Sequence, residues 1–207
     1  MNRAPPSDTA PGAIRIVPIT AAYAQVFREV VGEVARERRY LRATDAFSID
    51  QAMTFVGDNV IRSNPHFVAL DRDRVVGWCD IVRLPFEGEN HRGTLGIGLL
   101  APYRGRGVGR RLMDAALTHA RAKGFERVEL AVRASNLRAI GLYRALGFVE
   151  EGRRRDAIKL DGTFDDELLM AWFARPANKR PVTKRAADES QQGPGSNGAD
   201  NGVQKWQ

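Results

Sequence analysis

Strand-like and helix-like segments alternate between residues 14 and 173, and this alternation constrains the fold more than any other feature of the chain. One helical stretch shows the spacing clearly, since Val26, Val30 and Val34 fall on one face. The expected order is β-α-α-β-β-β-α-β-α-β-β, with strands at 14–19, 66–70, 75–84, 94–100, 127–132, 148–160 and 164–173 and helices at 21–38, 49–61, 107–123 and 136–146.

Turn residues separate these segments and indicate the fold class. The turn from Asp71 to Arg74 and the pair Asp161-Gly162 each join two expected strands into a hairpin. Ser48 is a good N-cap, and Gly124 and Gly147 stand where a C′ glycine ends a helix. Hairpins mixed with helical crossovers predict a single α/β (α+β) domain with a mixed, mostly antiparallel sheet flanked by helices.

The two ends of the chain differ from the rest in composition. Residues 1–12 are polar and rich in proline, and residues 176–207 contain almost no apolar side chains apart from Val203 and Trp206. Such segments bury too little apolar surface to offset the entropy that ordering costs. We therefore expect a disordered leader at 1–12, one folded domain at 13–175 and a disordered polar tail at 176–207.

Composition also restricts the class of protein. Of the 207 residues, 43% are apolar, which suffices for the core of one domain. The chain shows neither a signal-peptide pattern nor a run of about 18 apolar residues, so no membrane association is expected. The single cysteine, Cys79, excludes a disulfide framework and a cysteine-cluster metal site, and it fits a reducing, cytoplasmic location.

The chain is basic, with a formal net charge of +7 and a pI of about 10.1. This charge suggests nucleic acid or an anionic ligand as a partner. The arginines are scattered over 36–42, 104–111 and 153–155, without the interleaved aromatic residues that single-strand binders use. A solvated basic surface is the favoured interpretation, a phosphate-bearing ligand is an alternative, and a nucleic-acid partner is not expected.

The most informative segment is the glycine-rich stretch from Leu95 to Gly109. Gly96 and Gly98 lie inside an apolar strand, where glycine marks a bulge or the close approach of a ligand or another backbone. The strand leads into Arg104-Gly-Arg-Gly-Val-Gly109, which opens a helix. Free backbone N–H groups and the positive end of the helix dipole meet there, and this arrangement suits a phosphate or a pyrophosphate.

Two common phosphate-binding motifs fit this segment poorly. A Walker-A loop ends in Gly-Lys-Ser/Thr, whereas Gly109 is followed by Arg110 and Arg111. A dinucleotide fingerprint follows the first strand of a βαβ unit and needs an acidic residue at the end of the next strand. Here the loop lies in the middle of the chain, and the next strand ends in Arg133-Ala-Ser-Asn136.

The segment resembles the GNAT N-acetyltransferases. Arg104-x-x-Gly107-x-Gly109 matches the (Q/R)-x-x-G-x-(G/A) motif of that family. Downstream, residues 136–148 are similar to a second family block, N-x-x-A-x-x-L-Y-x-x-x-G-F. The resemblance covers about residues 14–173 and is tightest at 94–149. It implies acetyl-CoA as co-substrate, an amine as acceptor and no metal.

The resemblance also implies a set of site residues. Pantetheine would lie along the strand that ends at Leu99 and Leu100, in a gap where this strand diverges from 127–132. Asn136 would be a further cofactor contact. Tyr143 matches the tyrosine often assigned as general acid, and such a phenol would assist the departure of a thiolate whose conjugate acid has a pKa of about 8.5. The pyrophosphate would rest on the backbone of Arg104, Gly105, Arg106, Gly107, Val108 and Gly109.

Each of these assignments has a structural alternative. Arg104, Gly107 and Gly109 also suit a tight turn at the start of a helix. Tyr143 also suits a core position, and Asn136 suits a helix N-cap. The two blocks occur together in the expected order, and this agreement favours the functional interpretation.

The general base is left open, because several carboxylates and one histidine could remove the proton of the acceptor. His119 and Cys79 are interpreted as structural residues. The run from Arg153 to Asp156 is interpreted as a charged strand edge that prevents aggregation, with an acceptor contact as the alternative. The candidate bases are Glu33, Glu37, Glu87, Glu89 and His91.

We therefore expect an N-acetyltransferase that transfers an acetyl group from acetyl-CoA to a primary amine by direct attack in a ternary complex. The acceptor is either a small molecule or a protein amino group. One alternative is a non-catalytic acyl-CoA-binding module of the same fold, against which the presence of Tyr143 argues. Another is a nucleic-acid-associated basic protein. The oligomeric state is open, with a homodimer as one possibility.

Overall fold

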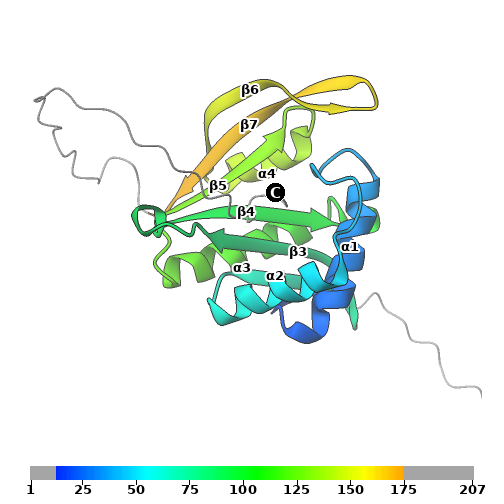
Figure 1. The fold of residues 1–207 in the computed structure, drawn as a ribbon, viewed down its shortest axis with the longest axis vertical. Coiled ribbons are helices and arrows are strands. Elements are labelled where there is room, and N and C mark those ends of the chain that lie inside the picture. Colours follow the sequence, from blue (N-terminus) through cyan, green and yellow to red (C-terminus); the bar gives the residue numbers. More distant parts are fainter. Residues whose placement is uncertain (1–12, 175–207) are drawn as a thin grey trace, which may run out of the picture.

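The computed structural model describes residues 13–174 and shows one seven-stranded sheet with helices on both faces (Figure 1). The helices are α1 (Ala24–Arg36), α2 (Ile49–Ile61), α3 (Val108–Ala122) and α4 (Leu137–Ala145), with short 3₁₀ turns η1 (Ala21–Tyr23), η2 (Glu87–Glu89) and η3 (Ala101–Tyr103). The strands are β1 (Arg15–Pro18), β2 (His66–Asp71), β3 (Arg74–Arg83), β4 (Arg92–Leu99), β5 (Arg127–Arg133), β6 (Val149–Leu160) and β7 (Thr163–Phe173).

The strand order is β1-β2-β3-β4-β5-β7-β6. Neighbouring strands are antiparallel except for β4 and β5, which are parallel. This topology confirms the expected α/β domain with a mixed, mostly antiparallel sheet. Each strand and helix expected from the sequence is present, although the helix expected at 21–38 begins as the 3₁₀ turn η1 and ends at Arg36.

Local sequence explains where several elements begin and end. Ser48 and Gln51 form a capping box at the start of α2. Gly124 and Gly147 follow α3 and α4 with φ values of 77° and 89°, which glycine adopts without strain. At the tip of the β6–β7 hairpin, Asp161 and Gly162 both have positive φ, as a type I′ turn requires.

The two faces of the sheet are covered by different helices. On one face, Phe27 of α1 packs edge-on against Trp78 of β3, with ring centroids 5.8 Å apart. On the other face, Phe125, which follows α3, lies beside Ile81 of β3 under Gly93 of β4. The helix α4 lies on this second face as well, because Leu142 approaches Gly109 of α3.

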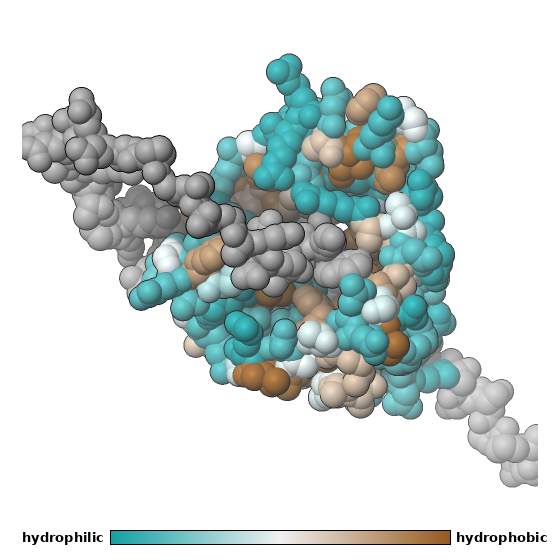
Figure 2. Space-filling model, viewed as in Figure 1, coloured by the Kyte–Doolittle hydropathy of each residue, from teal (hydrophilic) through white to brown (hydrophobic). Residues whose placement is uncertain are grey.

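The surface in Figure 2 is mostly hydrophilic, with hydrophobic residues gathered in separate small patches. Large exposed apolar side chains on α2 include Met53, Val60 and Ile61. In the part of the chain that the structure describes, no helix is long and apolar enough to cross a membrane. The expected leader at 1–12 and the expected tail at 176–207 lie outside the described residues.

Candidate active site

The parallel strands β4 and β5 are joined over only part of their length. Their register contains three residue pairs, from Arg92–Arg127 to Thr94–Glu129, and the later residues of both strands are unpaired with each other. Figure 1 shows the two strands diverging beyond this point. The sheet therefore opens along Leu95–Leu99, where the sequence predicts the pantetheine of acetyl-CoA.

The glycine-rich loop joins the end of β4 to the start of α3. Gly105 and Gly107 have φ values of 75° and 77°, and a Cβ atom at Gly107 would meet nothing within 4 Å. Gly107 is the N-cap of α3, and no side chain caps this helix. The backbone N–H groups of the first turn, at Val108 and Gly109, therefore lack a capping partner and suit an anionic group.

The side chain of Arg104 is engaged inside the protein. Its Nε atom donates to the carbonyl oxygen of Leu99 at 2.8 Å, and its guanidinium forms a two-pronged ion pair with Glu37 at the end of α1. The Tyr40 ring lies 4.6 Å from the guanidinium carbon. Arg104 thus ties α1 to the end of β4, and Glu37 neutralises the charge that it would offer to a phosphate.

Two further residues of the expected cofactor site have clear structural roles. The buried Leu100 donates its amide to the carbonyl of Val76 on β3, at 2.9 Å, and so fixes the end of β4. Asn136 caps α4 by accepting from the amide of Ala139 at 3.3 Å. The cofactor contacts of both residues stay predictions.

Tyr143 lies in α4 and is buried, with 7% of its surface exposed. Its ring packs against Phe148, with centroids 5.8 Å apart. Burial raises the pKa of Tyr143 well above its ordinary value, with a smaller contribution from the nearby thiol of Cys79 on β3. The hydroxyl is therefore protonated at neutral pH, as a proton donor must be.

The sequence suggested that Gly96 and Gly98 mark a bulge or the close approach of a ligand or another backbone. In the structure, both glycines lie against side chains of β3. A Cβ atom at Gly98 would lie 2.1 Å from the Trp78 ring, and one at Gly96 would lie 3.0 Å from Oδ1 of Asp80. The register between β3 and β4 is unbroken, so neither glycine marks a bulge there. Both glycines make room for side chains of β3 on the face that α1 covers.

Asp80 and His66 are the titratable groups that sequence analysis missed. They face each other in the β2–β3 register, and each is less than 5% exposed. Burial raises the pKa of Asp80 to about 7, although a hydrogen bond from Trp78 favours the charged form and partly lowers the pKa. Burial lowers the pKa of His66 to about 3. The one available signal was an aspartate inside the apolar strand sequence Val-Val-Gly-Trp-Cys-Asp-Ile-Val.

The base candidates named from the sequence are mostly at the surface or in ion pairs. Glu33, Glu87 and His91 are exposed. Glu89 pairs with Arg92, and Glu37 pairs with Arg104. Of the two residues interpreted as structural, His119 lies against Phe67, with ring centroids 5.7 Å apart, and Cys79 is fully buried. The described residues contain no cluster of three His, Cys, Asp or Glu that could hold a metal ion.

The family model for the acetyltransferase (GNAT) family matches residues 30–148, more than half of the chain. The chain belongs to the GNAT family. Its fold and its two sequence blocks agree with this membership, so the protein is an acetyltransferase that takes its acetyl group from acetyl-CoA.

Individual GNAT proteins resemble the chain to different extents. The N-alpha-acetyltransferase RimI of Mycobacterium tuberculosis is 36% identical over 127 residues, which cover 54% of this chain and 76% of that protein. An L-methionine sulfoximine/L-methionine sulfone acetyltransferase of Pseudomonas aeruginosa is 32% identical over 99 residues, 47% of this chain and 56% of that protein. A phosphinothricin acetyltransferase from Sinorhizobium meliloti, solved with acetyl-CoA, matches with a TM-score of 0.74 at 20% identity, covering 83% and 94% of the two chains.

Proposed function

We propose that the protein acetylates a primary amine by direct attack on acetyl-CoA in a ternary complex. The observation that carries the proposal is that three features of the site lie together. The opening between β4 and β5 leads to the uncapped start of α3, and the buried Tyr143 lies on the same face of the sheet as that helix. A thioester in this opening would have the loop for its pyrophosphate at one end and a phenol near its sulfur.

The cofactor site of the proposal uses the backbone more than side chains. Pantetheine lies along Leu99 and Leu100, and the pyrophosphate accepts hydrogen bonds from the amides of the loop between Arg104 and Gly109. Backbone N–H groups at a helix start suit this purpose, because they are fixed and carry the positive end of the helix dipole. Asn136, which matches the cofactor-contacting asparagine of the family, completes the set.

The chemistry requires two proton movements. The amine nitrogen forms a bond to the acetyl carbon, the carbon–sulfur bond breaks, and the thiolate takes a proton from Tyr143. The attacking nitrogen loses its own proton to a base, and we propose Asp80 for this role. Its carboxyl lies against Gly96 of β4 on the face that α1 covers, opposite the face of Tyr143. A pKa of about 7 suits a base at neutral pH.

The acceptor is an amino group of a small molecule or a protein. The relatives support both choices, since one is named an N-alpha-acetyltransferase and another is named for derivatives of L-methionine. A cytoplasmic location and a folded domain at 13–175 are part of the proposal, and the buried, unpaired Cys79 supports the location. A homodimer stays a prediction.

A nucleic-acid role has less support from the structure. Many arginines of the basic surface are paired with carboxylates, among them Arg36 with Asp45 and Arg38 with Asp161. Such pairs reduce the positive charge that a phosphate backbone would meet. A binding titration against salt tests this alternative, because several phosphate contacts give a steep dependence of affinity on salt.

The experiment that tests the proposed function is a thiol-release assay with a panel of amines. Acetyl-CoA and one longer acyl-CoA serve as donors, and free amino acids, polyamines and peptides serve as acceptors. We expect release of CoA that depends on both the amine and the protein. Release that no amine raises above the rate of hydrolysis would overturn the proposed transfer and favour a non-catalytic acyl-CoA-binding module.

A further inference from the structure

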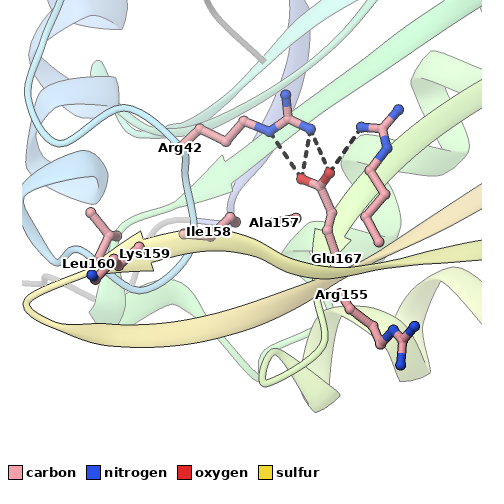
Figure 3. Close-up of a pocket in the computed structure, with 8 residues that line it drawn as sticks. Arg42, Arg155, Ala157, Ile158, Lys159, Leu160 and Glu167 are labelled. Atoms are coloured by element: carbon pink, nitrogen blue, oxygen red, sulfur yellow. Dashed lines mark hydrogen bonds and ion pairs between the residues drawn. The ribbon is translucent and has the colours of Figure 1, made fainter.

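A cavity of about 570 Å³ lies between the segment after α1 and the β6–β7 hairpin. Its wall includes Arg42, Arg154, Lys159 and Glu167 (Figure 3). The volume is typical of a site for a small molecule. Glu167 is opposite Arg133, the last residue of β5, in the β5–β7 register. The cavity therefore lies beside the end of one of the two diverging strands.

The same segment of chain connects this cavity to the proposed cofactor loop. Glu37 pairs with Arg104, next to the end of β4, and Arg42 pairs with Glu167, next to the end of β5. Residues 37–42 thus span the ends of the two strands between which the thioester is proposed to lie. Arg121 of α3 lies over the Trp172 ring, and Glu167, five residues earlier in the same unbroken strand, faces the other side, so the cavity lies on the same face of the sheet as Asp80.

Glu167 holds two guanidinium groups in place. Its carboxylate is almost fully buried and accepts from Nε and Nη2 of Arg42 at 3.0 and 2.7 Å. It also accepts from Nη1 of Arg154 at 3.2 Å, so both of its oxygens are occupied. A carboxylate in this position cannot also bind the ammonium group of a ligand or act as a base.

The two arginines keep unused donors and a net positive charge. Among the described residues, Nη1 of Arg42 and the Nε and Nη2 atoms of Arg154 have no hydrogen-bond acceptor. Two guanidinium groups share one carboxylate, and Lys159 adds a third positive charge to the wall, 4.8 Å from the Phe164 ring. Planar guanidinium groups that are already positioned bind a carboxylate with little further loss of entropy.

We propose that Arg42 and Arg154 bind a carboxylate of the acceptor, with Glu167 as the residue that positions them. This inference rests on the proposed function and narrows it to small amines that carry a carboxylate, the chemical class of the amino acids. The run at 153–156 then contributes an acceptor contact through Arg154. Arg155 also lines the cavity, but its side chain points away from Glu167 (Figure 3).

The experiment compares L-amino acids with their own amides as acceptors, under saturating acetyl-CoA. The wild-type protein is expected to acetylate the acids with a kcat/KM about 10- to 100-fold above that of the amides, the range of hydrogen bonds to a charged group. Intrinsic reactivity favours the amides, because their amino groups have a lower pKa and are more often neutral. A preference for the acids therefore reports recognition of the carboxylate.

Variants assign this preference to the cavity. Arg154→Gln should lower the ratio of kcat/KM for acids to kcat/KM for amides to near one. It should do so by raising KM for the acids, with no change in KM for acetyl-CoA. Arg154→Lys, which keeps the charge without the planar fork, should retain part of the ratio. Arg153→Gln is the matched control on the same strand, because Arg153 pairs with Asp166 outside the lining of the cavity, and it should leave the ratio unchanged.

The outcomes separate this inference from the proposed function. Equal turnover of acids and amides, or a preference for peptides over free amino acids, would overturn the carboxylate site while leaving acetyl transfer intact. A ratio that Arg153→Gln lowers as much as Arg154→Gln would also overturn it. Failure of every amine to release thiol would overturn the proposed function itself.

Discussion

His66 and Asp80 lie opposite each other in the β2–β3 ladder, and burial shifts their pKa values in opposite directions. Burial favours the neutral form of both groups, so it lowers the pKa of the imidazole to about 3 and raises that of the carboxyl to about 7. In unfolded chains the two groups have pKa values of about 6.5 and about 3.9. The pair therefore links folding to pH in two opposing ways.

Between about pH 4 and 6.5 the two effects on stability should cancel. The folded protein keeps a proton on Asp80 that the unfolded chain releases, so this group makes stability fall as pH rises. The unfolded chain binds a proton on His66 that the folded protein excludes, so this group makes stability rise with pH. Each slope is about 1.4 kcal/mol per pH unit. The paired carboxylates Asp165 and Asp166 have lowered pKa values and titrate below this window.

Two variants separate the opposing effects of Asp80 and His66 on the pH dependence of stability. Urea unfolding of Asp80→Asn across this window should show stability that rises with pH, because only His66 still responds. His66→Gln should show stability that falls with pH. Equal pH slopes in Asp80→Asn and in the wild type would mean that Asp80 is ionised in the folded protein throughout the window.

Gly107→Glu should abolish the rise in melting temperature that CoA or acetyl-CoA gives to the wild-type protein. A ligand that binds only the folded state stabilises it by mass action, and the new carboxylate would occupy the place of the pyrophosphate. Gly124→Glu is the matched control at the other end of α3. Both glycines have φ of 77° with no atom within 4 Å of a Cβ, so the backbone strain is similar.

The relative stabilities of the two glycine variants without ligand discriminate between backbone strain and loss of ligand binding. A glutamate favours the start of a helix and disfavours its end, so Gly107→Glu should be at least as stable as Gly124→Glu without ligand. Only Gly107→Glu should lose the response to CoA. A folded Gly107→Glu protein that binds CoA normally would refute the placement of the pyrophosphate on this loop.

Gly98→Ala should destabilise the protein by about 1–3 kcal/mol, the usual cost of overpacking a core. The new methyl group would lie 2.1 Å from the Trp78 ring, inside the sheet. Gly57→Ala in α2 is the control, since a Cβ there meets nothing within 4 Å. That change should stabilise the protein by about 0.5–1 kcal/mol. Equal effects in urea unfolding would show that Gly98 has no packing role.

The fold could be predicted from the sequence because its signals are local. Gly124 and Gly147 ended helices, Asp161-Gly162 closed a hairpin, and Ser48 began α2, and each of these acts within a few residues. The placement of the glycine loop at the start of a helix followed in the same way. The exact ends of the helices were harder to predict. Arg38, just after α1, adopts a positive φ of 55° although it is not a glycine, so no residue type marked the end of this helix.

The partners of the site residues could not be predicted, because they are distant in the chain. Glu37, which neutralises Arg104, is 67 residues away, and Arg42 is 125 residues from Glu167. The Trp78 ring over Gly98 lies on another strand. No spacing rule connects such pairs, and for this reason Asp80 and the arginine cavity emerged only from the structure.

Tyr143→Phe should lower kcat by ~10²-fold, the lower end of the range for a lost acid catalyst. The change removes one hydroxyl and almost no volume, so stability and CoA binding should hardly change. The KM for acetyl-CoA should also stay the same, since the lost interaction belongs to the transition state. A loss confined to KM, or to stability, would make Tyr143 a packing residue.

We propose above all that acetyl-CoA and an amine react with each other in the opening between β4 and β5. The most direct measurement follows free thiol and acetylated amine in the same reaction, with the product identified by mass spectrometry. We expect equal amounts of the two products, formed only when both substrates are present and formed more slowly by Tyr143→Phe. Thiol without acetylated amine, or CoA binding without either product, would contradict it.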